Sequence, residues 1–399
     1  MIASEIKNYF ESNYNSRPLV VKAPGRINLI GEHTDYNLGY VLPASIEKGI
    51  YFAVSGNAKA EINIETFLTS PEKITFNLKG KHTAYNAGWG NYFKAIIEIL
   101  VENNYPLKGM DCVFGGDIPI GSGLSSSAAL CCGFLYALSK VCEQHITRED
   151  IALIAQKAEH KIGLNCGLMD QYAVLFGKSK NALFLDCRDL SHKYIPVNLK
   201  GYSWVLINSK ITHNLAVDSE YNKRRISCEN IVAKIAEKRS EITSLRDVTM
   251  NDLKSIESDV NPTDYKRAHY IIAENQRVLK MIEVLNSGDA IQVGNILLEG
   301  HWAMSKEFEI TTKELDYLVE SGQDLEGIMG SRMMGGGFGG CTINLIKTET
   351  VEENLKKILY SYKNQTGINA EVYRLNIDDG VHIVEDVSRK EDFNKKAVK

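Results

Sequence analysis

The stretch PIGSGLSSSAA, residues 119–129, says most about the fold. It follows a short predicted strand, MDCVF (110–114), and leads into a predicted buried helix at 125–145. Gly121 and Gly123 let the backbone approach a ligand closely. The serines that follow open a helix whose free N–H groups and dipole favour an anion. The order of strand, Gly/Ser loop and helix therefore predicts a phosphate cradle, and the alternative is a glycine turn with serine caps.

Two other glycine-containing segments do not match nucleotide-binding fingerprints. The closest approach to a Walker A loop, YAVLFGKS (172–179), has a tyrosine where the first glycine should be, and we expect a helix followed by a turn. The cluster MGGGFGG (334–340) meets the GxGxxG pattern formally. However, CTINLI (341–346) follows it and reads as a strand, whereas a dinucleotide fingerprint opens a helix. We expect this cluster to form a flexible turn beside a ligand.

Length and composition indicate a globular chain with two domains. At 399 residues the chain exceeds one ordinary core, so two domains of roughly 150 to 200 residues are expected. Hydrophobic content of 44% and charged content of 24% are typical of soluble proteins. A net charge of −4 gives no indication of nucleic-acid or anionic-membrane binding.

The chain is expected to be cytoplasmic. Its longest apolar run, at 128–138, is too short to span a bilayer, and its N-terminus lacks the layout of a signal peptide. The eight cysteines form no CxxC pair and no Cys/His metal spacing. They fit a reduced compartment, where they behave as small core residues.

Hydrophobic periodicity predicts a mixed α/β chain. Four strands are expected in the first hundred residues, at 18–23, 48–54, 60–65 and 73–78. Helices are expected at 89–104 and 146–161, the second capped by Thr147 and Asp150. The second half is expected to contain strands at 202–209, 341–346 and 370–377 and helices at 217–240, 263–286, 290–307 and 349–365.

A second unusual segment is GRINLIGEHTDYN (25–37), which places Arg26, Glu32, His33 and Asp35 among apolar residues. Charged groups cannot be buried cheaply without partners. One interpretation is a strand-to-loop corner with local salt bridges. The other is a binding loop for a polyhydroxylated ligand, because each sugar hydroxyl both donates and accepts hydrogen bonds.

Two acidic residues have no clear role from local pattern alone. The local pattern around Asp170, in GLNCGLMDQY (163–172), favours a helix cap or a paired core acid over a catalyst. Glu159 is one of many acidic residues on predicted helix faces.

These segments, in this order, resemble the galactokinases of the GHMP small-molecule kinase superfamily. GRINLIGEHTDYN is similar to the galactokinase signature, IGSGLSSSAA to the second family motif, and SRMMGGGFGGCTINL to the third. The likeness extends over nearly the whole chain, through VLPASI (41–46), GLMDQY (167–172), RAHYIIAENQRV (267–278) and LLEGHW (297–302).

The resemblance implies a two-domain GHMP kinase fold with the active site in the cleft between mixed α/β domains at 1–199 and 200–399. It implies transfer of the γ-phosphoryl of MgATP to the C1 hydroxyl of α-D-galactose, the first step of the Leloir pathway. Asp170 matches the catalytic carboxylate that takes the hydroxyl proton, and Arg26 the arginine that holds it ionised. Both roles suit phosphoryl transfer, which depends mostly on positioning and charge stabilisation.

The resemblance also assigns binding residues. Glu32, His33, Asp35, Gly167 and Tyr221 match residues that hold the sugar, with Asp35 the expected reader of C3 and C4. The triphosphate cradle corresponds to Gly121, Ser122, Gly123, Leu124, Ser125, Ser126 and Ser127. The magnesium shell corresponds to Ser126 or Ser127 with Glu159. The family's nucleotide-side WxNY segment corresponds to Trp89, Asn91 and Tyr92.

Some features depart from the family pattern. The spacer between Glu159 and Asp170 is one residue short, Met334 replaces the usual threonine, and Leu38 replaces a small or polar loop residue.

Two alternatives to galactose phosphorylation stay open. A kinase for a related sugar such as N-acetylgalactosamine would need room at C2, whereas the Glu32-His33 pair disfavours a uronic acid. A galactose sensor would bind without turnover, but the second motif is intact and Asp170 and Arg26 are both present. We expect a monomer that binds small molecules and neither nucleic acid nor membrane.

Overall fold

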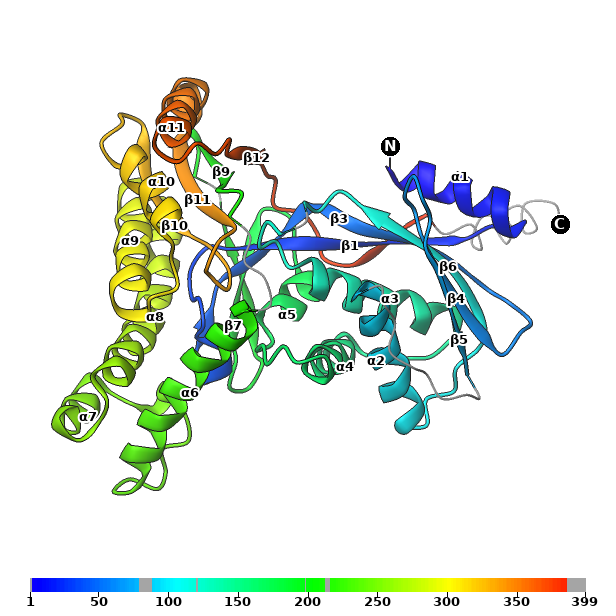
Figure 1. Ribbon diagram of the computed structural model, residues 1–399, viewed down its shortest axis with the longest axis horizontal. Helices are drawn as coiled ribbons and strands as arrows, with labels where there is room; N and C mark the ends of the chain where they lie inside the picture. The colour runs from blue at the N-terminus through cyan, green and yellow to red at the C-terminus, as the bar shows by residue number, and fades with distance from the viewer. Residues whose placement is uncertain (1, 79–87, 120, 198, 212–215, 386–399) are drawn as a thin grey trace.

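Two layered units make up the protein, each built on its own β-sheet. The computed structural model describes residues 2–78, 88–119, 121–197, 199–211 and 216–385, so Ile120 of the Gly/Ser loop lies outside the described residues. In Figure 1 the N-terminal sheet lies on the right and the C-terminal sheet with its helices on the left.

The first sheet has six strands in the order β13-β1-β3-β6-β4-β5. All neighbours pair antiparallel except β4 and β6, which are parallel. The four strands expected in the first hundred residues all belong to this sheet. Its strands are β1 (Leu19–Asn28), β3 (Pro43–Gly56), β4 (Glu61–Thr66), β5 (Lys73–Asn77), β6 (Met110–Gly116) and β13 (His382–Glu385).

Helices cover both faces of this sheet. Alternate residues of a strand point to opposite faces, so Phe52 packs under the α2–α5 side while Ala53 packs under α1. Helix α1 was not predicted, although Ile6 and Phe10 bury one of its faces at i, i+4 spacing. The helices are α1 (Ile2–Tyr14), α2 (Gly88–Glu102), α3 (Ser126–Val141), α4 (Arg148–Lys161) and α5 (Met169–Phe176).

The helix cap predicted at Thr147 is confirmed. The Thr147 Oγ accepts a hydrogen bond from the Asp150 backbone N–H at 3.0 Å, and helix α4 starts at the next residue, Arg148.

The second sheet has four antiparallel strands in the order β10-β11-β9-β12. Helices α8 and α9 pack on the face that carries Leu206, and α10 and α11 on the face that carries Val205 and Ile207. The strands are β9 (Tyr202–Asn208), β10 (Ile328–Met333), β11 (Cys341–Lys347) and β12 (Glu371–Arg374). The helices are α6 (Ala216–Ala236), α7 (Met250–Lys254), α8 (Pro262–Ser287), α9 (Ala290–Ala303), α10 (Lys313–Gln323) and α11 (Val351–Thr366).

The strands and long helices predicted for the second half are confirmed, with shifted ends. The helix expected at 290–307 ends as α9 at Ala303 and continues as a π-helical turn, Met304–Phe308. Helices α7 and α10 were not predicted. Three small strands form a separate sheet, β2 (Tyr40–Val41), β7 (Asn181–Asp186) and β8 (His192–Pro196), and short 3-10 turns occur at Asp35–Asn37, Leu245–Asp247, Glu257–Asp259 and Thr348–Thr350.

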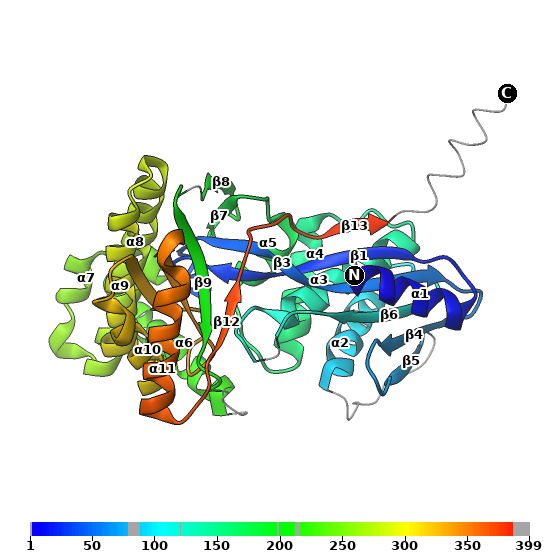
Figure 2. The same cartoon turned by 90° about the horizontal axis from the view of Figure 1, so that it is seen from above.

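The two units share a hydrophobic core, and strand β13 from the C-terminal half belongs to the first sheet. Apolar residues that follow β1 and lead into β3, including Leu29 and Leu42, pack against Val278 of α8 and Leu297 of α9. Near its end the chain returns to the first sheet, where β13 pairs with β1 (Figure 2). Strands β1 to β6 precede residue 200 and strands β9 to β12 follow it, and a domain boundary at 199/200 stays a prediction. No helix in the described ranges is long and apolar enough to cross a membrane.

Candidate active site

A small cavity of about 190 Å³ lies where the end of β1, α5, α6 and the Gly-rich turn converge. Pockets for drug-sized ligands are larger, roughly 300 to 1,000 Å³, so this cavity suits a ligand the size of one sugar ring. It brings together every residue predicted to be catalytic or to contact the sugar. The lining residues are Arg26, Glu32, His33, Asp35, Leu164, Cys166, Gly167, Met169, Asp170, Tyr221, Gly335 and Gly336.

Arg26 and Asp170 form a two-pronged ion pair on the cavity wall. The Arg26 Nε lies 2.7 Å from Asp170 Oδ1, and its Nη2 lies 3.0 Å from Oδ2. The third nitrogen, Nη1, donates to the Gly123 carbonyl at 2.6 Å. The arginine is buried, whereas 28% of the Asp170 side chain stays exposed. One guanidinium thus joins the carboxylate to the Gly/Ser loop with charge-assisted hydrogen bonds.

The Gly/Ser loop has the geometry of an anion site. Gly121 and Gly123 have φ values of 71° and 73°, which glycine adopts without strain. Helix α3 begins at the exposed Ser126, and its N-cap residue, Ser125, makes no side-chain cap. The Ser125 hydroxyl instead donates to Asp170, so the N–H groups of the first turn stay available to an anion. Serine capping, the alternative interpretation of this loop, is not what the structure contains.

Two predicted cradle residues turn their side chains inward. Ser122 is buried and its hydroxyl donates to the Pro119 carbonyl at 2.6 Å. Leu124 is buried in the core that joins the two units, and its carbonyl accepts the Arg26 N–H at 3.1 Å. Ser122 and Leu124 can therefore offer a ligand only backbone groups.

The Gly-rich turn packs against the Gly/Ser loop. A Cβ at Gly335 would come within 3.4 Å of the Gly123 carbonyl, and one at Gly340 within 3.4 Å of the Ser122 carbonyl. Met334, the residue that departs from the family pattern, is buried in the shared core and does not line the cavity. The Gly-rich turn (334–340) and the Gly/Ser loop (119–129) lie far apart in the sequence, and here they approach each other through backbone atoms.

Both ring nitrogens of His33 form hydrogen bonds within the protein, which fixes the orientation of the ring. Its Nε2–H donates to the Gly336 carbonyl at 3.1 Å, so its Nδ1 accepts from the Tyr36 hydroxyl at 2.8 Å. Burial lowers the pKa of His33 to about 4, which keeps the ring neutral. The ring lies 4.6 Å from that of Tyr221, which α6 presents to the cavity. Since both nitrogens have protein partners, this geometry supports a role in shaping the cavity.

The backbone of Gly167 packs directly against the Asp35 carboxylate. A Cβ at this position would overlap Asp35 Oδ2 and Cγ. The Tyr36 N–H donates to Asp35 Oδ1 at 2.9 Å and fixes the other side of the group. Glycine is therefore needed at 167 for this carboxylate to keep its place.

For galactose, the sugar that the resemblance implies, we expect Gly167→Ala to weaken binding by about 10-fold or more, because the added methyl must displace Asp35 from the cavity wall. Isothermal titration with galactose measures this effect. Gly88→Ala is the matched control, since a Cβ there would meet no atom within 4 Å. Equal galactose affinity in both variants would contradict this role of Gly167.

The pKa of Asp35 is raised to about 6, first by burial and then by the nearby Asp170 charge. The folded state therefore holds this proton more tightly than the unfolded state does, with its ordinary pKa of 3.8. This contribution to stability is fully present below about pH 4 and is lost as the pH rises through about 6.

We accordingly expect Asp35→Asn to gain stability relative to the parent protein as pH rises from about 4 to 7. The gain is at most about 3 kcal/mol, from the size of the pKa shift. Urea unfolding of both proteins across this range measures the difference. A difference that is flat with pH would show that Asp35 ionises as easily in the folded protein as in the unfolded chain.

Glu32 is held on both carboxylate oxygens. Its Oε1 accepts the Gly335 N–H at 3.1 Å, and Oε2 forms an ion pair with Arg332 on β10. These partners come from the other end of the chain. The interpretation of the 25–37 segment as a corner with local salt bridges is therefore wrong, because Arg26 pairs with Asp170 and Glu32 with Arg332, both far along the chain.

Glu159 and the helix-opening serines fit a magnesium shell in part. Burial raises the pKa of Glu159 to about 7, and the carboxylate accepts hydrogen bonds from Ser127 and Gln171. Carboxylate and hydroxyl oxygens are ligands that Mg²⁺ accepts, with phosphate oxygens and water completing the shell. Within the described ranges, no cluster of three or more His, Cys, Asp and Glu residues could hold a metal by itself.

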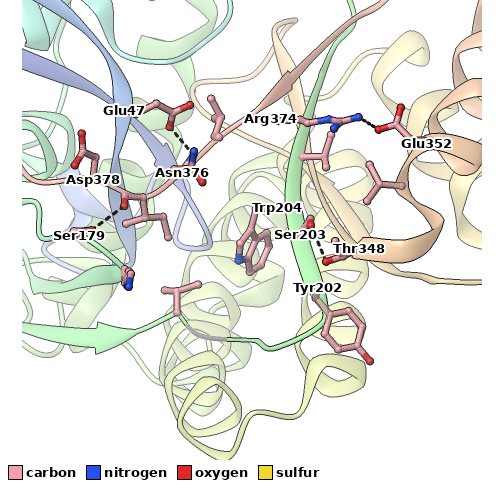
Figure 3. A pocket seen from close by; sticks show the side chains of 16 residues that line it. Glu47, Ser179, Tyr202, Ser203, Trp204, Thr348, Glu352, Arg374, Asn376 and Asp378 are labelled. Atoms are coloured by element: carbon pink, nitrogen blue, oxygen red, sulfur yellow. Dashed lines mark hydrogen bonds and ion pairs between the residues drawn. The ribbon is translucent and has the colours of Figure 1, made fainter.

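A larger cavity, about 820 Å³, lies elsewhere and contains none of the predicted site residues. Its polar side chains pair with one another, as Arg374 does with Glu352 and Ser203 with Thr348 (Figure 3). We assign the chemistry to the smaller cavity, because the Arg26–Asp170 pair and the Gly/Ser loop meet there.

The WxNY segment contributes to the first core. Trp89 packs against Phe93 and Phe114, and its indole N–H donates to Glu72 at 2.7 Å. A nucleotide-side role for Trp89, Asn91 and Tyr92 stays a prediction.

Sequence reasoning missed several residues of the site. Leu164, Cys166 and Met169 line the cavity beside Asp170, and their only signal was their place in the segment GLNCGLMDQY. Arg332 lay unremarked in the third motif. Side-chain partners this distant in sequence leave no local pattern.

Comparison with known proteins identifies the family. A model described as the galactokinase galactose-binding signature matches residues 8–56, and the GHMP kinase N-terminal and C-terminal domains match residues 91–178 and 281–364. A galactokinase of Thermotoga petrophila is 35% identical over 90% of this chain and 99% of its own length. One from Fusobacterium nucleatum is 36% identical over 95% and 99%.

Solved structures agree. The structure of Lactococcus lactis galactokinase complexed with galactose matches with a TM-score of 0.89 and 31% identity, over 96% of this chain and all of that one. A mevalonate kinase at 18% identity and a TM-score of 0.62 shares the fold. With a galactose-binding signature at its N-terminus, both GHMP domains and full-length relatives of this similarity, the chain belongs to the galactokinase family of GHMP kinases.

Proposed function

We propose that this protein is a sugar kinase that transfers the γ-phosphoryl group of ATP to the C1 hydroxyl of α-D-galactose, giving galactose 1-phosphate and ADP. The family supports the reaction. One observation carries its assignment to this cavity. The Arg26 guanidinium holds Asp170 in the sugar-sized cavity and, through Gly123, the loop that opens helix α3.

Asp170 is the proposed base. Its exposed part faces the cavity, so it can accept the C1 hydroxyl proton as the bond to phosphorus forms. Arg26 orients this carboxylate through two hydrogen bonds, and its guanidinium can stabilise charge that develops on the transferring group. The Ser125 hydroxyl of the Gly/Ser loop donates to Asp170 Oδ2, the oxygen that also accepts from Arg26 Nη2.

The proposed sugar contacts come from both units. Glu32 and Asp35 offer carboxylate oxygens that accept hydrogen bonds from hydroxyl groups, while Gly167 leaves room beside Asp35. His33 and Tyr221 form an aromatic wall. A wall of this kind suits the apolar C–H face of a sugar.

The proposed nucleotide site is the Gly/Ser loop. Backbone N–H groups at the start of α3 would hold the phosphates, and Ser126, Ser127 and Glu159 would supply oxygen ligands to Mg²⁺. The metal, when bound, neutralises charge on the phosphates.

A coupled assay of ADP release tests the proposal, with MgATP and galactose, glucose, N-acetylgalactosamine, galacturonate or arabinose. We expect strong turnover with galactose alone. Stronger turnover with N-acetylgalactosamine would make this protein a kinase for that sugar. No turnover with any sugar, together with a galactose-dependent rise in Tm, would point to a sensor.

A further inference from the structure

The Glu32 carboxylate stands at one end of a buried chain of charges that runs into the C-terminal unit. Arg332 and Glu274 are completely buried, Glu32 is 1% exposed, and Arg277 is 7% exposed. Arg332 pairs with Glu32, and its Nη1 lies 3.6 Å from Glu274 Oε1. Arg277 then pairs with Glu274 Oε2 at 2.6 Å. Two cations and two anions balance, which is what burial of such groups requires.

This cluster also holds the backbone that directly precedes Glu32. The Arg332 Nη1 donates to the Leu29 carbonyl at 3.0 Å, and Glu274 Oε1 accepts the Gly31 N–H at 2.9 Å. The side chain of Glu32 and the main chain that leads to it are therefore fixed by residues about 240 to 300 positions away.

The strand that carries Arg332 is itself anchored. The Met333 N–H donates to Nδ1 of the fully buried His301 at 3.1 Å, and His301 Nε2 lies 3.3 Å from Asp316 Oδ1. The Arg332 Nε donates to the Met333 carbonyl at 3.1 Å. The guanidinium is thus pre-organised before any ligand arrives.

Glu32 differs from the rest of the cluster because it lines the cavity. When the carboxylate is ionised and correctly turned, it acts purely as an acceptor for sugar hydroxyl groups, whereas protonation turns one oxygen into a donor. A buried carboxylate without a cation would protonate or move. Arg332 does not line the cavity itself, so it can act on a ligand only through Glu32.

We propose that Arg332 is a positioning residue for sugar binding, which acts by holding the Glu32 carboxylate ionised and oriented toward the bound galactose. This inference rests on the proposed function, since it concerns the same sugar. It makes β10, and not only the N-terminal loop, part of the sugar specificity of the site.

Arg332→Met and Arg332→Lys test the proposal, with kcat and KM measured separately for galactose and for ATP. For Arg332→Met we expect the galactose KM to rise about 10- to 100-fold, the usual effect of losing a hydrogen bond to a charged group, with a smaller change in kcat and none in the KM for ATP. Arg332→Lys keeps the charge but not the fork of donors, so it should recover part of the loss.

Glu32→Gln and the double variant Glu32→Gln/Arg332→Met show whether Arg332 acts through Glu32. We expect the galactose KM of the double variant to be close to that of Glu32→Gln alone, because the second change removes nothing further. Multiplied effects of the two changes would overturn the proposal. If Arg332→Met does not fold, the comparison is made with Arg332→Lys.

Arg277→Met is the matched control. It removes another buried guanidinium of the same cluster, but Arg277 contacts Glu274 and Glu299 and not Glu32. We expect it to lower Tm without changing the galactose KM. An equal rise in galactose KM for Arg277→Met, or none for Arg332→Met, would reduce the cluster to a stabilising element. Failure of the proposed function would look different, as absence of galactose turnover in the parent protein.

Discussion

Replacing Asp170 with asparagine is expected to lower kcat for galactose by about 10²- to 10⁴-fold, the usual size of a general-base contribution. Asparagine keeps the shape of the side chain but cannot accept the hydroxyl proton. ATP affinity, measured by titration, should change little, because Asp170 lines the sugar cavity.

The chain offers a matched ion pair as a control, whose cation lies on β1 as Arg26 does. Lys22 and Asp378 form an ion pair at 2.7 Å, with side chains 9% and 33% exposed, against 5% and 28% for Arg26 and Asp170. Asp378→Asn should therefore lower stability without lowering kcat. Near-normal turnover of Asp170→Asn would remove Asp170 from the mechanism.

Replacing Arg26 with methionine is expected to lower kcat by about 10²- to 10³-fold, the usual cost of losing one group that stabilises developing charge. It also leaves Asp170 without its cation and frees the Gly123 carbonyl. Unlike Asp170→Asn, it should weaken ATP binding as well, since the lost guanidinium holds the Gly/Ser loop at the Gly123 carbonyl. Steady-state kinetics with both substrates separates the two variants.

Lys22→Met controls for the loss of a buried cation from β1. Arg26→Lys refines the test, because lysine keeps the charge but cannot bind both Asp170 oxygens and Gly123 at once. We expect it to fall between the parent and Arg26→Met. Full activity of Arg26→Lys would mean that charge alone matters and that the forked geometry does not.

Local pattern predicted the elements that carry the site. The Gly/Ser loop was recognisable because glycine permits its positive φ angles and because a buried helix follows it. Alternating residues identified strands such as β5, in which Ile74 and Phe76 point inward. The charged residues of segment 25–37 stood out because they lie among apolar residues such as Leu29 and Ile30.

Long-range pairing was not predictable from pattern. Arg332 meets Glu32 across about 300 residues, and β13 returns to pair with β1 from the far end of the chain. Nothing in the local sequence around Arg332 or β13 indicates these contacts. The state of His33 was equally hidden, because only the folded structure reveals that Tyr36 and Gly336 occupy both ring nitrogens.

The most direct test of the account is the identity of the product. After incubation with MgATP and galactose, ³¹P NMR with proton coupling determines which hydroxyl carries the phosphate. The account predicts galactose 1-phosphate in the α configuration, formed in equal amount with ADP, and formed about 10²- to 10⁴-fold more slowly by Asp170→Asn. Phosphate on another hydroxyl, or ADP with free phosphate and no sugar phosphate, would contradict the placement of C1 between Asp170 and the Gly/Ser loop.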